Sequence, residues 1–153
     1  MAAIVTPAVN PIGDPSRREY GGILGANGSF YDAPPGPVAT GTSQGPEINL
    51  SPAFDKAAAA GTEPFIIAHS HVNFRTKSEG ATMEGTWAPS PDDRKMLSGM
   101  QYGYGLVVLP RLDNPSFSMV TLFRSAKQNV DGENTDVSVS AGTLEKIVGG
   151  TNK

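Results

Sequence analysis

Glycine and proline occur so often along this chain that they constrain its fold class more than any other feature. The 153 residues include 18 glycines and 13 prolines. Proline breaks helices because it lacks a backbone N–H, and glycine weakens them because it loses more backbone freedom on folding. We therefore expect a compact fold with long, shaped loops rather than a helical bundle. The length predicts one domain with a real core and excludes a (β/α)₈ barrel, which needs about 250 residues.

Charge and cysteine content exclude several classes of function. The net charge of −3 provides no excess of positive charge that would attract a nucleic-acid backbone, so no nucleic-acid partner is expected. The absence of cysteine excludes disulfides, thiolate metal sites and a cysteine nucleophile. The first 20 residues do not read as a signal peptide, and no apolar run approaches the roughly 18 residues that span a bilayer. We expect a soluble protein without a membrane partner, either cytoplasmic or delivered outside the cell.

The chain divides into an irregular leader or linker, residues 1–18, and a single domain, residues 19–153. In the domain, a short apolar segment Glu19–Leu24 leads into the turn residues Gly25–Gly28, and extended character resumes at Phe30, which predicts a β-hairpin. Ser51 is expected to cap a first helix that ends at Gly61, and Ser90 to cap a second that runs to about Met100.

Short apolar runs between these segments predict the remaining strands, at residues 65–68, 106–109, 117–123 and, as an edge strand, around 137–139. A short last helix is expected at 143–148. Residues 72–89 are polar and mixed and show no clear period. The order of elements predicts an α/β or α+β domain with a mixed central sheet flanked by two or three helices.

The only two histidines of the chain, His69 and His71, lie two residues apart at the end of the first of these apolar strands. Random placement would give this spacing in about 1% of cases. Residues i and i+2 of a strand project from the same face, so both imidazoles would reach one point. Imidazole is a common zinc ligand, which favours a metal site over the alternative of two unrelated surface histidines.

A catalytic zinc ion takes three protein ligands, and without cysteine the third must be a carboxylate. Asp92 and Asp93 lie in the first turn of the second predicted helix, and Ser90 and Asp93 could share one side of its start. The same Ser-Pro-Asp-Asp run is also an ordinary helix opening, in which serine caps and carboxylates favour the helix dipole. Its proximity to the histidine pair in the chain favours the ligand interpretation.

Attack by a metal-activated water on a carbonyl also requires a base. The candidates are Glu19, Glu47, Glu63, Glu79 and Glu84. Glu19 is modestly preferred, because it adjoins a short apolar segment in which a strand could fix its position.

The combination of Glu19, His69-Ser70-His71 and Ser90-x-x-Asp93 resembles the JAMM motif of the JAB/MPN metalloproteases. The flanking segments 18–22 and 106–108 are similar as well. More narrowly, the REYGG and APSPDD segments resemble an uncharacterised JAB-like domain found at the ends of bacterial Rhs and related polymorphic toxin proteins. The resemblance covers roughly residues 10–125 and implies the JAB/MPN fold, with a layering similar to that of cytidine deaminases.

The resemblance also implies roles for individual residues. His69, His71 and Asp93 would ligate one Zn²⁺ ion, with water in the fourth position. Glu19 would accept the proton of that water and pass it to the leaving amine, and Ser90 would donate a hydrogen bond to the developing oxyanion. Members of the family cut amide or isopeptide bonds, so a protein or peptide substrate is expected. The toxin association would add an immunity protein as a partner.

Two departures from the family pattern concern the segment that follows the histidines. Val72 stands where the family usually has proline, and residues 72–89 form a longer spacer before the serine than the family usually has. A loop of any length can bring its ends together at small entropic cost, so the ligands can still converge. The insertion is either a lid or substrate-recognition loop, with Phe74 and Trp87 as candidate substrate contacts, or a surface excursion.

Three functions differ in the residues that they require. The leading one is a zinc-dependent peptidase or isopeptidase. The alternative is a non-catalytic JAB-like binding or scaffold module, which would have no need for both Glu19 and Ser90. A different metal hydrolase that begins with H-x-H would need a larger barrel and more histidines. A zinc deaminase is excluded because it needs H-x-E and P-C-x-x-C motifs.

Overall fold

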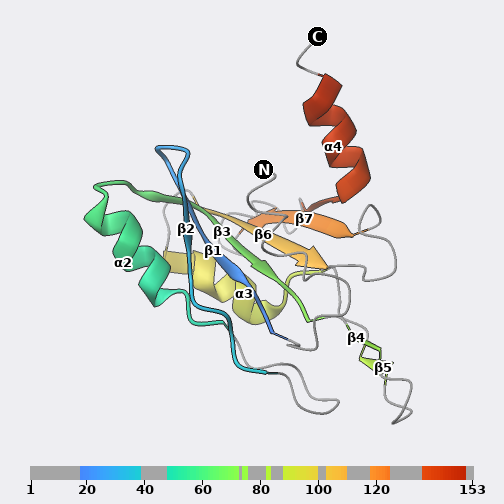
Figure 1. Ribbon diagram of the computed structural model, residues 1–153, viewed down its shortest axis with the longest axis horizontal. Coiled ribbons are helices and arrows are strands. Elements are labelled where there is room, and N and C mark those ends of the chain that lie inside the picture. The colour runs from blue at the N-terminus through green and yellow to red at the C-terminus, as the bar shows by residue number, and fades with distance from the viewer. Residues whose placement is uncertain are drawn as a thin grey trace.

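A mixed six-stranded sheet is the centre of the fold in the computed structural model, which describes residues 18–38, 48–72, 74–75, 82–83, 88–99, 103–109, 118–124 and 136–150. The strands lie in the order β2-β1-β3-β6-β7-β8 (Figure 1). Their bounds are β1 Gly21–Gly25, β2 Phe30–Asp32, β3 Pro64–Ser70, β6 Tyr104–Leu109, β7 Met119–Arg124 and β8 Val137–Ser140. The expected leader lies almost wholly outside the described residues.

Only one pair of neighbours in this sheet is parallel, which makes it mixed as predicted. β3 and β6 run parallel with His69 opposite Val107, and the four other pairs are antiparallel. The β1–β3 pairing places Gly21 opposite His69. The predicted hairpin is confirmed as β1 and β2, and its turn includes Gly28 at a φ of +80°, which only glycine adopts without strain. The predicted edge strand is confirmed as β8.

The first predicted helix is confirmed as α2, Ser51–Ala59, but its predicted cap is wrong. The N-cap residue is Leu50, and no side chain caps this helix. Leu50 is buried in the core, so packing rather than a serine hydroxyl sets the start of the helix. Instead, the backbone N–H of Ser51 donates to the side chain of Asn49. The helix ends before Gly61, which has a φ of +65°.

The second and third predicted helices are also present. α3 covers Pro91–Met96 with Ser90 as its N-cap, and the chain tightens into a 3₁₀ turn at Leu97–Gly99 instead of continuing as α-helix to Met100. α4 covers Ala141–Gly150 and is longer than the expected 143–148. In Figure 1, α4 projects away from the sheet beside the C-terminus.

The sheet separates two apolar clusters, one on each face. One face packs against α2 and the turn after α3, through the buried residues Ile23, Ala53, Ala57, Ile67, Leu97, Val107 and Phe123. The other face carries Ala68, Leu106, Val108 and Val120, with Leu144 of α4 packed against them. Gly105 is essential to the first cluster, because a Cβ there would lie 2.1 Å from the ring of Phe123. Side chains of β3 alternate between the two clusters, and His69 belongs to the face covered by α3.

The segment 72–89, expected to be irregular, contains a second, two-stranded sheet. β4, Phe74–Arg75, pairs antiparallel with β5, Thr82–Met83. Figure 1 shows this pair apart from the six-stranded sheet, beyond the end of β3. A small hairpin therefore lies within the insertion and begins three residues after His71.

Candidate metal centre

The two histidines lie where β3 leaves the sheet. Phe65–Ala68 form the apolar part of β3, His69 and Ser70 complete the strand, and His71 follows one residue beyond it. His69 is 4% exposed and His71 is half-buried. The backbone N–H of His71 donates to the carbonyl of Val108 on β6, which fixes the chain at the point where the strand ends. The carboxyl end of a strand next to a parallel neighbour is a usual place for a ligand site in an α/β sheet.

The N-terminus of α3 supplies a carboxylate to the same place. Ser90 and Asp93 form a capping box, in which the Asp93 N–H donates to the Ser90 hydroxyl over 3.1 Å and the Ser90 N–H donates to Asp93 Oδ2 over 2.6 Å. This reciprocal pair satisfies two backbone donors at the helix start and fixes the rotamer of Asp93. Asp92, the other candidate, is exposed. The structure thus brings Asp93 to the histidines.

Asp93 bridges the two imidazoles with its two oxygens. His69 Nε2 lies 3.0 Å from Asp93 Oδ1, and His71 Nε2 lies 3.4 Å from Asp93 Oδ2. The three ligand atoms lie within 4.8 Å of one another, so the group could hold a metal ion. Two ligands bound tetrahedrally at about 2.05 Å lie about 3.3 Å apart, and each imidazole nitrogen lies at about this distance from one of the two Asp93 oxygens. The convergence expected of His69, His71 and Asp93 is therefore present in the fold.

The carboxylate of Asp93 is held in its charged form. Burial raises the pKa of this carboxyl, but hydrogen bonds from His69 and His71 outweigh burial and hold the pKa well below its usual range. An anionic oxygen beside two imidazoles is the donor set of a divalent transition metal. His69 Nδ1 is buried without a hydrogen-bond partner among the residues that the structure describes. An incompletely paired buried imidazole is unusual in a purely structural core.

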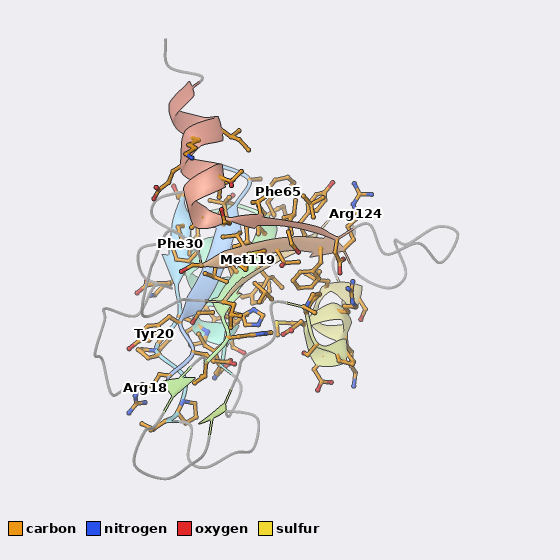
Figure 2. The ribbon with its side chains drawn as sticks, turned by 90° about the vertical axis from the view of Figure 1, so that its right-hand side faces the viewer. Arg18, Tyr20, Phe30, Phe65, Met119 and Arg124 are labelled. Atoms are coloured by element: carbon orange, nitrogen blue, oxygen red, sulfur yellow. The ribbon has the colours of Figure 1, made fainter. Side chains whose placement is uncertain are left out.

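Glu19 lies beside this cluster because the segment before β1 continues the β1–β3 pairing. The Ser70 N–H donates to the Tyr20 carbonyl over 2.7 Å, one residue further along the register that pairs Gly21 with His69. One more step along the same register places Glu19 opposite His71. Figure 2 shows Arg18 and Tyr20 toward the end of the molecule opposite Phe65 and Arg124, which lie near the start of β3 and the end of β7.

Two backbone amides fix Glu19. Its carbonyl accepts the Gly36 N–H over 2.9 Å, and its carboxylate accepts the Ile48 N–H over 3.3 Å. Burial raises the pKa of the Glu19 carboxyl, while the imidazoles of His69 and His71 and the Ile48 amide oppose the rise. A carboxylate with a raised pKa accepts a proton more readily than an exposed one.

Gly21 lies at a close approach of β1 to β3, which the sequence motifs did not predict. A Cβ on Gly21 would lie 2.4 Å from the Ala68 carbonyl oxygen and 2.8 Å from His69 Cβ. The glycine therefore allows β1 to pack directly against His69, which brings the strand of Glu19 close to the histidines. Adjacent glycines at 21 and 22, on an otherwise apolar segment, were the only signal in the sequence for this close approach.

Most of the remaining predicted residues lie in parts of the chain whose side chains the structure does not describe. Trp87 lies outside the described residues, and of Phe74 only the backbone, in β4, is described. Glu47, Glu79 and Glu84 also lie outside the described residues. Glu63 is exposed and precedes β3, at the opposite end of that strand from the histidines.

No protein-family model matches this chain, and neither a curated protein nor a solved structure matches it. Among the helices that the structure describes, none is long and apolar enough to cross a membrane.

Proposed function

We propose that this chain is a zinc-dependent metallopeptidase or isopeptidase of the JAMM type, with a JAB/MPN fold. One observation carries the proposal: His69, His71 and Asp93 converge with ligand-like spacing while Glu19 and Ser90 flank them. These five side chains come from three separate segments of the chain. A fold that needed only stability would have no reason to gather two imidazoles and two carboxylates at one end of its sheet.

The donor set supports zinc over other metals. Two imidazole nitrogens and one carboxylate oxygen form a borderline set that suits Zn²⁺, whereas Ca²⁺ and Mg²⁺ prefer oxygen ligands alone. Three protein ligands are typical of catalytic zinc sites, which keep a fourth position for water or substrate. The distance of 3.0 Å between His69 Nε2 and Asp93 Oδ1 is compatible with two ligands of one zinc ion.

Zinc at this site would polarise a substrate carbonyl and lower the pKa of a water molecule toward 7. Glu19, held by the Ile48 amide, accepts the proton of the attacking water on its carboxylate and returns it to the leaving amine. Ser90 uses its hydroxyl oxygen to accept the Asp93 N–H, so its own proton is free to be donated to the carbonyl oxygen as negative charge develops. The products are a carboxylic acid and an amine.

The wider biological setting follows from the resemblance alone. On that ground we propose a protein or peptide substrate, a role as a bacterial effector domain and an immunity protein as its partner. The β4–β5 hairpin supports a substrate-facing role for the insertion, because it begins three residues after His71.

The first experiment measures metal content. We expect about one zinc ion per chain by elemental mass spectrometry of the purified untagged protein. His71→Ala and Asp93→Ala should lose it, whereas Asp92→Ala should keep it as a matched control, because Asp92 is exposed beside the site. Absence of zinc from the wild type, even after reconstitution, would contradict the proposal and leave a non-catalytic JAB-like binding or scaffold module as the better description.

The second experiment measures cleavage. The probes are a pool of internally quenched peptides and ubiquitin carrying a C-terminal aminomethylcoumarin. Glu19→Gln should keep both fold and zinc while it abolishes cleavage, since the amide cannot take up the proton. Glu63→Gln, an exposed glutamate at the other end of β3, is the control that should cleave normally. Cleavage by Glu19→Gln at the wild-type rate would refute the assigned base.

A further inference from the structure

Ser70, the residue between the two histidines, makes a contact that the proposed chemistry does not use. Its side chain is 2% exposed, and it lies on the strand between two candidate ligands that point to the other face of the sheet. The Ser70 hydroxyl accepts the backbone N–H of Tyr20 over 3.0 Å. Tyr20 directly follows Glu19, so this hydroxyl is bonded to the residue next to the proposed base.

The contact replaces a bond of the sheet ladder. A hydrogen-bonded antiparallel pair exchanges two backbone N–H···O bonds. Ser70 and Tyr20 keep the first, from the Ser70 N–H to the Tyr20 carbonyl over 2.7 Å, but the return bond ends on the Ser70 hydroxyl instead of on a backbone carbonyl. The serine side chain thus continues the pairing of β1 with β3 at the position where the regular ladder stops.

The regular pairing of β1 with β3 ends at Gly21 and His69, next to Tyr20 and Ser70. The next backbone donor along the chain, the His71 N–H, points to the opposite neighbour, as alternate residues of a strand do, and bonds to the Val108 carbonyl of β6 over 2.9 Å. The Ser70 hydroxyl therefore adds a second hydrogen bond to the one that the Tyr20 carbonyl accepts from the Ser70 N–H. Glu19 is held on its other side by the Gly36 N–H.

We propose that Ser70 is a positioning residue, whose hydroxyl ties the segment Glu19–Tyr20 to the end of β3 and so sets the distance between the Glu19 carboxylate and the metal ligands. This inference rests on the proposed function, because it assigns the hydroxyl to the alignment of the base. It also makes a structural claim that does not need activity: Ser70 holds the segment, and its loss releases that segment locally rather than the whole sheet.

Amide hydrogen exchange on the full ¹⁵N-labelled chain tests the structural claim. In Ser70→Ala, the Tyr20 and Gly36 amides should exchange about tenfold faster relative to the Val107 amide in the centre of the sheet. Ser70→Thr keeps a hydroxyl on a β-branched residue suited to a strand and should restore protection. Equal exchange of the Tyr20 amide in Ser70→Ala and the wild type would overturn the claim.

Thr121→Val is the matched control. Thr121 is a buried residue of β7 whose hydroxyl bonds to that of Ser138 over 2.8 Å, and valine keeps its shape. The control should show the general cost of a lost buried hydroxyl without faster exchange at Tyr20 and Gly36.

Metal content and kinetics test the positioning role. Ser70→Ala should keep one zinc ion per chain and an unchanged KM for the quenched-peptide pool, but lose about tenfold or more in kcat, because small displacements of a catalytic group are costly. Ser70→Thr should recover kcat, and Thr121→Val should keep it. Loss of zinc from Ser70→Ala, or a kcat equal to that of Thr121→Val, would overturn the positioning role.

The failure of this inference can be distinguished from failure of the proposed function. If the wild type binds no zinc, or if Glu19→Gln still cleaves, the proposed function fails and the positioning role fails with it. The hydrogen-exchange pattern still decides whether Ser70 holds the segment Glu19–Tyr20. If Glu19→Gln is inactive and Ser70→Ala is as fast as the wild type, only the positioning role fails.

Discussion

Removal of the Asp93 carboxylate should destabilise the protein even when no metal is present. Three hydrogen bonds end on this side chain, from the Ser90 N–H and from the Nε2 atoms of His69 and His71. In Asp93→Ala the helix keeps one half of its capping box, because the backbone N–H of residue 93 still reaches the Ser90 hydroxyl. The Ser90 N–H and the buried His69 imidazole both lose their acceptor.

The magnitude follows from these losses. A lost helix-cap bond costs about 1 kcal/mol, and an unpaired buried polar group costs about 1–3 kcal/mol. We therefore expect the free energy of unfolding of metal-free Asp93→Ala to fall by about 2–4 kcal/mol. Asp92→Ala, which removes an exposed carboxylate one residue earlier, should change it by at most about 0.5 kcal/mol. Asp93→Asn keeps one acceptor oxygen and should fall between the two.

Urea unfolding in the presence of a chelator measures these differences in stability. The same titration in the presence of zinc then measures how much the metal stabilises each variant. Zinc at 100 times its Kd would stabilise the wild type by a further 2.7 kcal/mol or so, and it should not stabilise Asp93→Ala. Equal stability of metal-free Asp93→Ala and Asp92→Ala would refute the claim that hydrogen bonds to Asp93 stabilise the metal-free protein. An equal response of Asp93→Ala and the wild type to zinc would refute the ligand assignment.

Three further predictions concern Ser90 and two positions away from the candidate site. Ser90→Ala should lower kcat by about 10²–10³ with little change in zinc content. Ser90→Thr should retain activity, because it keeps the hydroxyl. A full rate in Ser90→Ala would exclude a role of this hydroxyl in the transition state. Gly105→Ala should lower the free energy of unfolding, measured by urea titration, by about 1–3 kcal/mol, because the new Cβ would overlap the ring of Phe123. A loss below about 0.5 kcal/mol would show that the ring can move aside. Asp32→Asn breaks an exposed ion pair with a lysine of α2 and should change the free energy of unfolding by less than about 1 kcal/mol. A larger loss would show that this ion pair contributes to the stability of the fold.

Local sequence signals were reliable where the structure depends on neighbouring residues. The hairpin turn at Gly25–Gly28 and the end of α2 at Gly61 were predicted from residues that favour those backbone conformations. Ser90 was predicted as a helix cap for the same reason. The prediction for Ser51 was wrong because a long-range effect, the burial of Leu50, sets the start of α2.

The sequence by itself therefore determined which chemical groups are available and which short elements carry them. It identified a histidine pair at a strand end, a serine-capped helix with a carboxylate at its third position, and a domain of short strands with few helices. These features follow from side-chain periodicity and capping, which act over a few residues.

Only the tertiary structure decided which groups meet. It places Asp93, the carboxylate that the resemblance implied, and not Asp92, beside the histidines through the reciprocal cap, and it places Glu19 rather than Glu63 there through the register of β1 on β3. It also revealed the Ser70 hydroxyl at the point where that register ends. Strand register and helix docking are set by the burial of the whole sheet, over separations of about 50 residues, and no local pattern encodes them.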